Sequence, residues 1–515
     1  MLADPGAWIA IPLLAVQVLL LAVFSFFSFF NYLYGIASLW QRPIRRVPPS
    51  ARRVAVVIVA FNEEHVLEAT VRACDALSHP NRLTVLADDS TDPRVVESLR
   101  GAARARGCKR LVDHGQFQQT TDDTGQLRSE PIEIWESPDF VLMHRPKNVG
   151  FKAGSLVQVQ EYLCRHGIDL MYLLDADWHP QQDAIERTLE VLEADPGLAF
   201  VQTKRVSFPQ RMNLFQKYVT IIEEGCYFVD FAGRQTLGHP ILFSGCCTLF
   251  RLDAVAAVGG FTPGHLTEDL DLSNRFWLKG WRGVYLQDVV NQGEVPFTYD
   301  HFRRQQERWA SGSARAFKAF LWPILTTREL SWVHKLSVLR QNAYFTTTLL
   351  TAVAILLGML TCTWLSLAWN SYGVELYLHA FGQFHVVFGV LLYWCLLSNL
   401  VEPTIMIVFK KKATIELCHL PMMVWYAWSV IPTYVIGNIK GLTGISQDWF
   451  RTPKVVRGQA APPSRIPPML RIINVAAVAA AIAYYFSQMW VFGGYDQFAI
   501  LVIPAFILAA VQFRD

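Results

Sequence analysis

The stretch LMYLLDADWHP, residues 170–180, joins an apolar run to two carboxylates, which is typical of a buried β-strand followed by a polar turn. Asp175 and Asp177 lie at positions i and i+2, so both side chains project from one face of the sheet. Carboxylates at this spacing suit Mg²⁺ or Mn²⁺, which proteins hold by one or two carboxylates together with substrate phosphates. A turn that caps the strand explains the same residues. The stretch therefore indicates either a metal site or a strand-ending turn.

Three earlier apolar runs predict strands of the same sheet. They are VAVVIVA (54–60), LTVLADD (83–89) and DFVLMHR (139–145), and helix-like stretches at 63–77 and 151–166 lie between the strands. This alternation predicts an α/β domain with mainly parallel strands. Open α/β sheets bind ligands beyond the carboxyl ends of their strands, so the residues that follow these runs are candidate site residues.

Polar side chains follow the first two of these strands. Asp88 and Asp89 end the second strand, and Phe61-Asn62-Glu63-Glu64 follows the first. Carboxylates there can accept hydrogen bonds from a nucleobase or a sugar, and capping of a turn is an equally good explanation. Two neighbouring acidic strand ends favour a binding edge more strongly than either one does alone.

The stretch KNVGFKAGSL (147–156) places Gly150 and Gly154 around Lys152 at the start of a predicted helix. Glycine lets a backbone approach a ligand closely, and a lysine beside a helix N-terminus favours phosphate. A plain helix start with a surface lysine is the alternative.

The stretch HLTEDLDLSNRFWLKGW (265–281) places Glu268 and Asp269 before an amphipathic helix. Thr267 as N-cap, with acidic residues in the first turn, explains this spacing. A carboxylate here is also a candidate general base that deprotonates an alcohol.

The stretch HFRRQQERWASG (301–312) has helical spacing, and Gln305, Arg308 and Trp309 share one helix face at i, i+3 and i+4. Arginine can hold a pyrophosphate in a bidentate fork, and tryptophan offers a flat surface on which a sugar ring stacks. An amphipathic helix at a membrane surface is the alternative, with the tryptophan at headgroup level.

The composition is that of a membrane protein with a soluble domain: 515 residues, 52% hydrophobic and 17% charged. The formal net charge of +3 implies no nucleic-acid partner. The nine cysteines lack metal-ligand spacing, which indicates reduced thiols. The apolar stretches are 8–40, 343–369, 382–409, 420–438, 471–490 and 497–513.

The charges around these stretches predict their orientation. Arg42, Arg45, Arg46, Arg52 and Arg53 follow the first stretch, which places the next domain in the cytoplasm. A crossing at 420–438 would put the basic linker 447–471 outside, so we expect an interfacial or re-entrant helix there. The predicted layout is an N-terminal transmembrane helix at 1–41, a cytosolic domain with interfacial helices at 42–320 and a C-terminal transmembrane region at 321–515.

Taken in order, Asp88-Asp89, Asp175-Ala-Asp177, Thr267-Glu268-Asp269 and the Gln305 to Trp309 motif resemble the processive family 2 glycosyltransferases, which include cellulose, hyaluronan and chitin synthases. DDSTDP, FKAGSL and VQTKRVSF bring the chain closest to the cellulose-synthase-like mannan and glucan synthases. The resemblance covers roughly residues 50–320. It implies an α/β nucleotide-sugar-binding domain of the GT-A type.

The resemblance also implies roles for the matching residues. Asp88 and Asp89 would contact the nucleoside and Lys152 the diphosphate, while Asp175 and Asp177 would bind the sugar nucleotide and its Mg²⁺ or Mn²⁺. Asp269 would be the general base, positioned by Glu268. Gln305 and Arg308 would hold the acceptor end and the pyrophosphate, and Trp309 would stack on the acceptor sugar.

A further match is WFRTPK (449–454), which is similar to the gating loop of the cellulose synthases, a Phe/Trp-x-Val-Thr-x-Lys pattern. Trp449, Thr452 and Lys454 fit this pattern, and Arg451 stands where it has valine. A cytosolic gating loop at about 446–458 agrees with the charge argument against a crossing at 420–438.

These motifs imply an inverting, membrane-integrated enzyme that polymerises a β-glycan from UDP-glucose or GDP-mannose and passes it across a plasma, inner or Golgi-type membrane. Its partners would be the donor, the growing glycan, the bilayer and export subunits of unknown type. One alternative transfers sugars to a lipid such as ceramide or diacylglycerol. A second alternative is a non-enzymatic transporter, for which His385 and Glu402 are the ionisable residues in the apolar stretches.

Overall fold

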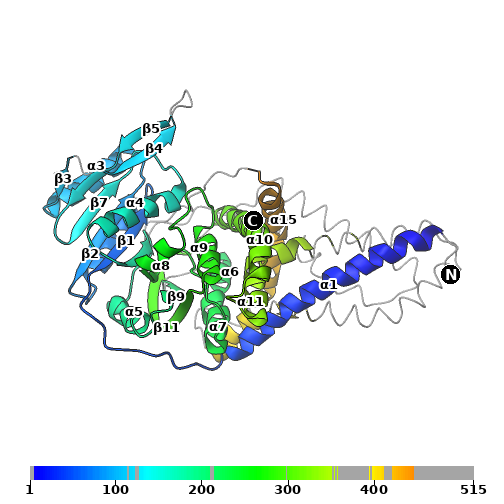
Figure 1. Ribbon diagram of the computed structural model, residues 1–515. Coiled ribbons are helices and arrows are strands. Elements are labelled where there is room, and N and C mark those ends of the chain that lie inside the picture. The colour runs from blue at the N-terminus through cyan, green and yellow to red at the C-terminus, as the bar shows by residue number, and fades with distance from the viewer. Residues whose placement is uncertain are drawn as a thin grey trace.

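The computed structural model of the chain describes residues 5–112, 115–121, 127–208, 214–296, 298–350, 400–410 and 420–445, with single positions between 353 and 398. An α/β domain lies on one side of the molecule, and the long helix α1 (Pro5–Ala37) points away from it (Figure 1). Helices between these two parts carry several of the predicted site residues.

The centre of the α/β domain is one nine-stranded sheet in the order β11-β9-β10-β8-β1-β2-β7-β6-β3. Its strands are β1 (Val54–Ala60), β2 (Arg82–Asp88), β3 (Lys109–Leu111), β6 (Glu133–Glu136), β7 (Phe140–His144), β8 (Leu170–Asp175), β9 (Leu198–Ser207), β10 (Thr248–Arg251) and β11 (Arg282–Gly293). A separate hairpin consists of β4 (Phe117–Thr121) and β5 (Leu127–Pro131).

The four strands predicted from the sequence are the parallel centre of this sheet, β8-β1-β2-β7. The prediction of a mainly parallel sheet holds only there and for the pair β9 and β11, because β10, β6 and β3 pair antiparallel with their neighbours. The outer strands are short or mix polar and apolar residues, so they lack the continuous apolar run of a buried parallel strand.

Register aligns the carboxyl ends of the central strands. Ala60 at the end of β1 lies opposite Asp88 of β2, Asp88 lies opposite His144 of β7, and Val59 lies opposite Asp175 of β8. The loops that leave these strands therefore meet at one edge of the sheet, as the sequence predicted.

Both faces of the sheet are covered by helices, because alternate residues of the central strands are apolar on both sides. Ala55 and Val57 of β1 pack in one buried cluster, while Val56 and Ile58 pack in the other. The helices of the domain are α2 (Glu64–Asp75), α3 (Pro93–Ala105), α4 (Phe151–Arg165), α5 (Ala184–Leu192), α6 (Leu214–Gly225), the π-helix η1 (Cys226–Phe231), α7 (Ala232–Leu237), α8 (Leu252–Ala257) and α9 (Glu268–Leu278).

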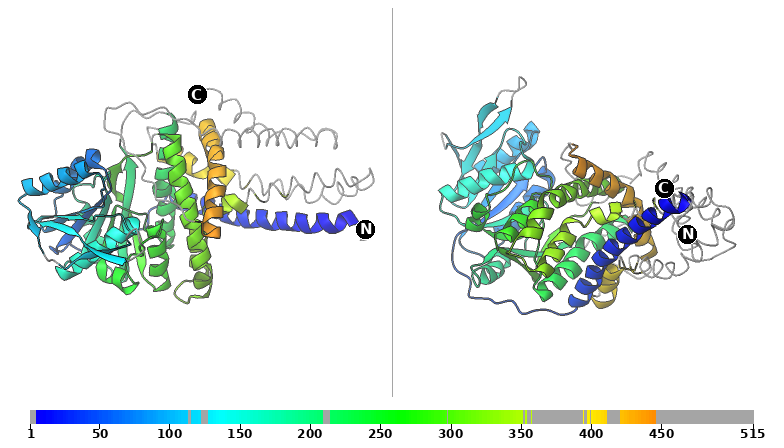
Figure 2. Two further views of the ribbon diagram at one scale, coloured as in Figure 1. Left: turned by 90° about the horizontal axis from the view of Figure 1, so that it is seen from above. Right: turned by 45° about the vertical axis from the view of Figure 1, so that its right-hand side comes forward.

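The remaining helices include α10 (Tyr299–Thr326), α11 (Trp332–Asn342), α14 (Val401–Thr404), the π-helix η2 (Ile405–Phe409) and α15 (Leu420–Thr443). Helices α10 and α15 lie side by side and crosswise to α1 (Figure 2). Two glycines of α15 permit this close packing, since a Cβ atom on Gly437 would lie 2.7 Å from the Glu307 carbonyl oxygen and one on Gly441 2.3 Å from that of Ser311.

The predicted membrane segments are only partly described. Among the described helices, none combines the length and the apolar composition needed to cross a membrane. The helix expected at 420–438 is present as α15, and its interfacial position stays a prediction. The predicted spans at 471–490 and 497–513 lie outside the described residues.

The arginines after α1 have a use that the charge argument did not foresee. The segment after α1 runs along the α/β domain, and Arg46 Nη1 and Nη2 lie 3.0 Å from Glu190 and 2.8 Å from Asp288. Arg52 forms an ion pair with Asp169. Part of this positive charge therefore fastens the segment to the domain.

Candidate active site

Lys152 connects three of the predicted motifs. It stands in the first turn of α4, and its Nζ donates to the Asp175 carboxylate at the end of β8 and to the Gly245 carbonyl oxygen at 2.7 Å. Glu268 Oε1 lies 3.7 Å from the same nitrogen. Burial acts to lower the pKa of Lys152, but Asp175 and Glu268 outweigh it and the pKa is raised. Lys152 is therefore a fixed cation among carboxylates.

The loop that contains Gly245 lies between Lys152 and the predicted general base. Gly245 has φ 88°, which favours glycine, and a Cβ atom there would lie 3.6 Å from Asp269 Oδ2. The next strand, β10, begins three residues later at Thr248. The loop thus brings a backbone carbonyl to Lys152 and lies close to the Asp269 carboxylate.

Glu268 and Asp269 begin α9, and their environment raises both carboxyl pKa values. For Glu268, burial raises the pKa to about 7, with Lys152 acting against it and Asp269 adding to it. For Asp269, burial raises the pKa, while a hydrogen bond from the Leu270 backbone nitrogen at 2.8 Å and the charge of Lys152 act to lower it. A buried carboxylate with a raised pKa is suited to accept a proton near neutral pH.

Thr267 does not cap α9 with its side chain, so capping alone does not account for this motif. Its methyl and hydroxyl pack instead on α10, where a Cβ atom on Gly312 would lie 2.3 Å from Thr267 Cγ2. Gly312 is one helical turn after Arg308, so this contact brings the acidic motif next to the arginine.

Helix α10 contains Gln305, Arg308 and Trp309, which confirms the helical spacing predicted for them. Burial lowers the pKa of Arg308, and the charges of Glu268, Asp269 and Asp175 act against this shift. Gln305 Oε1 is buried and has no hydrogen-bond partner in the described part of the chain. The charges of both acidic motifs therefore act on Arg308, as expected if these motifs and α10 form one site.

Asp88 and Asp89 are buried and bonded to protein groups. Asp88 Oδ1 accepts hydrogen bonds from the Ser90 nitrogen and hydroxyl, at 3.2 and 2.5 Å, and its Oδ2 lies 2.7 Å from His144 Nδ1. Asp89 accepts from Arg145 Nε at 2.6 Å, and burial raises its pKa against the opposing effect of Arg145. Hydrogen bonds within the turn therefore explain part of the Asp88-Asp89 motif. Direct contact of these carboxylates with a nucleoside stays a prediction.

Sequence reasoning missed His144 and Arg145 as partners of this motif. They are the last two residues of DFVLMHR, and the signal was their place at the end of the strand next to β2. Arg145 forms a buried ion pair with Asp89, and the His144 ring is within hydrogen-bond distance of Asp88.

Asp175 is the last residue of β8, and Asp177 lies in the turn that follows it. The Asp175 side chain is 36% exposed and Asp177 is buried. No group of three His, Cys, Asp or Glu side chains in the described ranges is placed to hold a metal ion. The carboxylates of Asp175 and Asp177 suit a divalent cation that takes its remaining ligands from substrate phosphates and water. Lys152 occupies one Asp175 oxygen, so such binding would depend on the substrate.

Arg205 is a second site residue that sequence reasoning missed, although its stretch VQTKRVSF contributed to the resemblance. Its guanidinium lies 5.1 Å from the Trp178 ring centre and 4.9 Å from that of Tyr227, and its Nη1 is 3.3 Å from Cys246 Sγ. The charge of Arg205 also acts to lower the pKa of Asp269.

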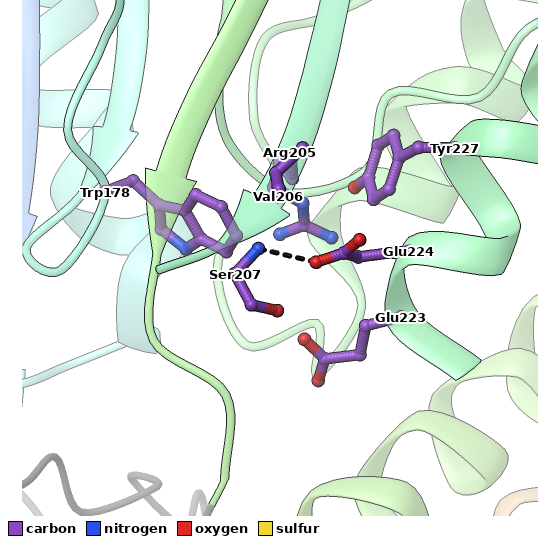
Figure 3. Close-up of a pocket in the computed structure, with 7 residues that line it drawn as sticks. All are labelled: Trp178, Arg205, Val206, Ser207, Glu223, Glu224 and Tyr227. Carbon is purple, nitrogen blue, oxygen red and sulfur yellow. Dashed lines mark hydrogen bonds between the residues drawn. The ribbon is translucent and has the colours of Figure 1, made fainter. Parts of the chain in front are cut away.

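Arg205, Trp178 and Tyr227 surround a shallow hollow, together with Val206, Ser207, Glu223 and Glu224 (Figure 3). Glu224 Oε1 accepts a hydrogen bond from the Ser207 nitrogen at 2.7 Å. The hollow adds an aromatic and charged wall next to the acidic motifs. The gating-loop residues Trp449, Thr452 and Lys454 lie outside the described residues.

Comparison with known proteins identifies relatives of this chain. The sequence profile described as Glycosyl transferase family group 2 matches residues 170–436, which include Asp175, Asp177, Glu268, Asp269 and Arg308. A probable glucomannan 4-beta-mannosyltransferase 9 of Oryza sativa subsp. japonica is 30% identical over 294 residues, which is 56% of this chain and 50% of the relative. Glucomannan 4-beta-mannosyltransferase 2 of Arabidopsis thaliana is 28% identical over 56% of this chain and 49% of the relative.

The chain thus spans about half the length of these curated relatives. Among solved structures, a mannosyltransferase of Pyrobaculum calidifontis in complex with GDP-Man and Mn²⁺ is 17% identical, with a TM-score of 0.47 over 78% of this chain and all of that chain.

Proposed function

Because the chain belongs to glycosyl transferase family group 2, we propose that it transfers a hexose from a nucleotide sugar to a glycan acceptor and forms a β-linkage. One observation carries this proposal: Asp269, a half-buried carboxylate of raised pKa next to the Gly245 loop, is subject to the charges of Lys152 and Arg308. A base next to cations is what an alcohol acceptor and a diphosphate leaving group require.

The proposed reaction is a single displacement. Asp269 accepts the proton of the acceptor hydroxyl, and the hydroxyl oxygen attacks the anomeric carbon of the donor. The bond from that carbon to the diphosphate oxygen breaks as the new bond forms, so an α-linked donor gives a β-linked product. A positioned base of this kind contributes roughly 10²–10⁴-fold in rate.

The departing diphosphate carries the negative charge away from the anomeric carbon. Lys152 and Arg308 are the proposed cations for the diphosphate, and the charges of nearby carboxylates favour their charged forms. Asp175 and Asp177 would hold Mg²⁺ or Mn²⁺ through substrate phosphates, where the metal neutralises charge on the leaving group. Preorganised positive charge at this point lowers the barrier because it needs no rearrangement during the reaction.

We propose GDP-mannose as the donor, with UDP-glucose as the competing candidate. The support is that the curated relatives named above are glucomannan 4-beta-mannosyltransferases. A panel of nucleotide sugars, with diphosphate release measured on the purified chain, tests this. Release from GDP-mannose supports the proposal, and preferred release from another donor replaces it. Release from no nucleotide sugar overturns the enzymatic function and favours the transporter.

Asp269→Asn tests the assignment of the base. We expect turnover to fall by about 10²–10⁴-fold while donor binding, measured by calorimetry, stays close to that of the parent chain. Near-normal turnover of Asp269→Asn would show that another group removes the proton.

We further propose that the enzyme is processive, spans the membrane several times with its catalytic domain in the cytosol, and passes its product through the membrane. The support is the composition, the order of the four motifs and WFRTPK. Product length from labelled donor in detergent separates this from transfer to a lipid: long products support the polymer synthase, and only short lipid-soluble products support the glycolipid enzyme.

A further inference from the structure

Next to the end of α1 the molecule exposes large apolar side chains. Trp40 is 61% exposed, and Trp332 and Val333 in the first turn of α11 are 66% and 54% exposed. Leu39 and Leu237 are also exposed. We call these five residues, together with the arginines described below, the aromatic-basic surface.

Contacts of Trp40 and of residues next to Leu237 and Val333 bring these positions together. The Thr236 hydroxyl, next to Leu237, donates to the Trp40 carbonyl oxygen at 2.9 Å. The rings of His239 and His334, just after Leu237 and Val333, lie 5.6 Å apart. The end of α1 lies beside α7 and α11 (Figure 1). The surface therefore combines three segments far apart in the sequence.

Positive charge accompanies this apolar area. Arg42, Arg45 and Arg328 are exposed, and in the described ranges none of them has a carboxylate partner. Arg46, by contrast, is held by two carboxylates of the α/β domain. Glu329 next to Arg328 removes one of the three charges, so the surface stays positive.

We propose that the aromatic-basic surface rests on the headgroup layer of a bilayer that contains anionic phospholipid. Tryptophan prefers the headgroup level, because its ring has an apolar body and a polar N–H. Arginines without protein partners are attracted to anionic lipid, each by about 1 kcal/mol. The contact uses none of the candidate active-site residues and needs no helix that crosses the membrane.

Photo-crosslinking from Val333 tests the contact with lipid. The full chain carries a benzophenone amino acid at Val333 and is placed in nanodiscs of neutral or anionic phospholipid. The control carries the same group at Val112, which is 79% exposed after β3, at the far edge of the sheet. We expect phospholipid adducts, detected by mass spectrometry, at position 333 and none at position 112. Adducts to a second copy of the chain, equal adducts at both positions, or no adduct would overturn the proposal.

Removal of the arginine charges tests the preference for anionic lipid. In a nanodisc of mixed lipid, the Val333 probe should capture anionic lipid in excess, and Arg42→Gln, Arg45→Gln and Arg328→Gln together should reduce this excess by about fivefold for each arginine. The control is Arg72→Gln, Arg94→Gln and Arg104→Gln, exposed arginines paired with carboxylates elsewhere on the domain. An excess that survives the first set, or is lost equally with the control set, would contradict the proposal. Diphosphate release measured in detergent reports separately on the proposed function.

Discussion

Two adjacent carboxylates share the half-buried start of α9, and this proximity determines how the candidate site responds to pH. Burial and the charge of Asp269 together raise the pKa of Glu268 to about 7, against the opposing charge of Lys152. Interaction between two such groups is mutual, so Glu268 also makes Asp269 harder to ionise. Lys152 and Arg308 act in the opposite direction and keep part of the pair charged at neutral pH.

The first prediction concerns the pH profile of transfer. The proposed base works only when ionised, and the pKa of Asp269 is raised, so turnover should fall with decreasing pH at a higher pH than an ordinary aspartate would give. Glu268→Gln keeps the shape and removes one negative charge, which lowers the pKa of Asp269. The inflection should then move to lower pH by about one unit or more. The shift is checked by measuring diphosphate release over roughly pH 5 to 9, which covers the range in which these carboxyl groups would titrate.

Glu161→Gln is the matched control for this experiment, because Glu161 is exposed and paired with Arg165 on α4. It should leave the inflection in place. An unchanged inflection in Glu268→Gln would show that the pair does not titrate as one unit.

At the scale of elements, α10 is held in place by glycines of α15. A Cβ atom on Gly441 would lie 2.3 Å from the Ser311 carbonyl oxygen, a backbone atom that cannot give way without moving the helix. Lys440 Nζ also lies 2.5 Å from Glu307 Oε1 across the same interface. Because Arg308 follows Glu307 directly, movement of α10 changes the position of the proposed leaving-group cation.

The second prediction is therefore that Gly441→Ala lowers both stability and turnover. We expect a loss of about 1–3 kcal/mol, typical of overpacking, and a larger relative loss in turnover because Arg308 is displaced. Gly101→Ala in α3 is the control, since nothing lies within 4 Å of its Cβ position. That change should stabilise its helix by roughly 0.5–1 kcal/mol. Thermal unfolding in detergent and diphosphate release give the two measurements, and normal values for Gly441→Ala would disprove the close contact.

Elements with continuous apolar runs were the ones that the sequence predicted well. VAVVIVA coincides with β1, and the runs before Asp88, His144 and Asp175 end within a residue or two of β2, β7 and β8. Strand β9 was missed because its second half, TKRVS, is polar and is held by pairing with β11. The hairpin of β4 and β5 is mostly polar and gives no periodic signal.

The site residues also divide into those that the local sequence revealed and those that it did not. The acidic motifs and the α10 trio were visible as local patterns, because carboxylates follow strands and helical spacing gathers side chains on one face. Arg205 and Arg145 were not visible, since their partners Trp178, Tyr227 and Asp89 come from other parts of the chain. Such long-range pairings depend on the fold and have no signal in the local sequence.

At the scale of the whole molecule, a buried ionic junction joins α1 to the catalytic domain. Asp230 on the π-helix η1 accepts from Arg234 Nε at 2.6 Å and pairs with Arg340 of α11. Arg340 also donates to Asn31 of α1. Burial acts to raise the pKa of Asp230, but the two arginines outweigh it and the pKa is lowered.

The same π-helix reaches the candidate active site. The hydroxyl of Tyr227 on η1 lies 2.7 Å from Ser244 Oγ, beside the Gly245 loop, and its ring lies against Arg205. π-Helical turns are rare and often occur at functional sites. A disturbance at Asp230 can therefore reach the loop beside the proposed base along one helix and through the Tyr227–Ser244 hydrogen bond.

The third prediction follows from this junction. Asp230→Asn keeps the volume of the side chain and leaves Arg234 and Arg340 buried without their counter-charge, which should cost about 3–5 kcal/mol. Asp75→Asn removes a carboxylate that pairs with Arg106 at 2.5 Å in a more exposed place, and it should cost at most about 1 kcal/mol.

The lowered pKa of Asp230 means that its stabilising effect is present at neutral pH and is lost as pH falls below the ordinary aspartate range. The difference in unfolding temperature between Asp230→Asn and the parent chain should therefore be large at neutral pH and shrink in acid. Turnover of Asp230→Asn, measured below its unfolding temperature, should also fall, because η1 positions Tyr227 beside the Gly245 loop. Equal stability of the two variants, or full turnover in Asp230→Asn, would show that the junction and the site are independent.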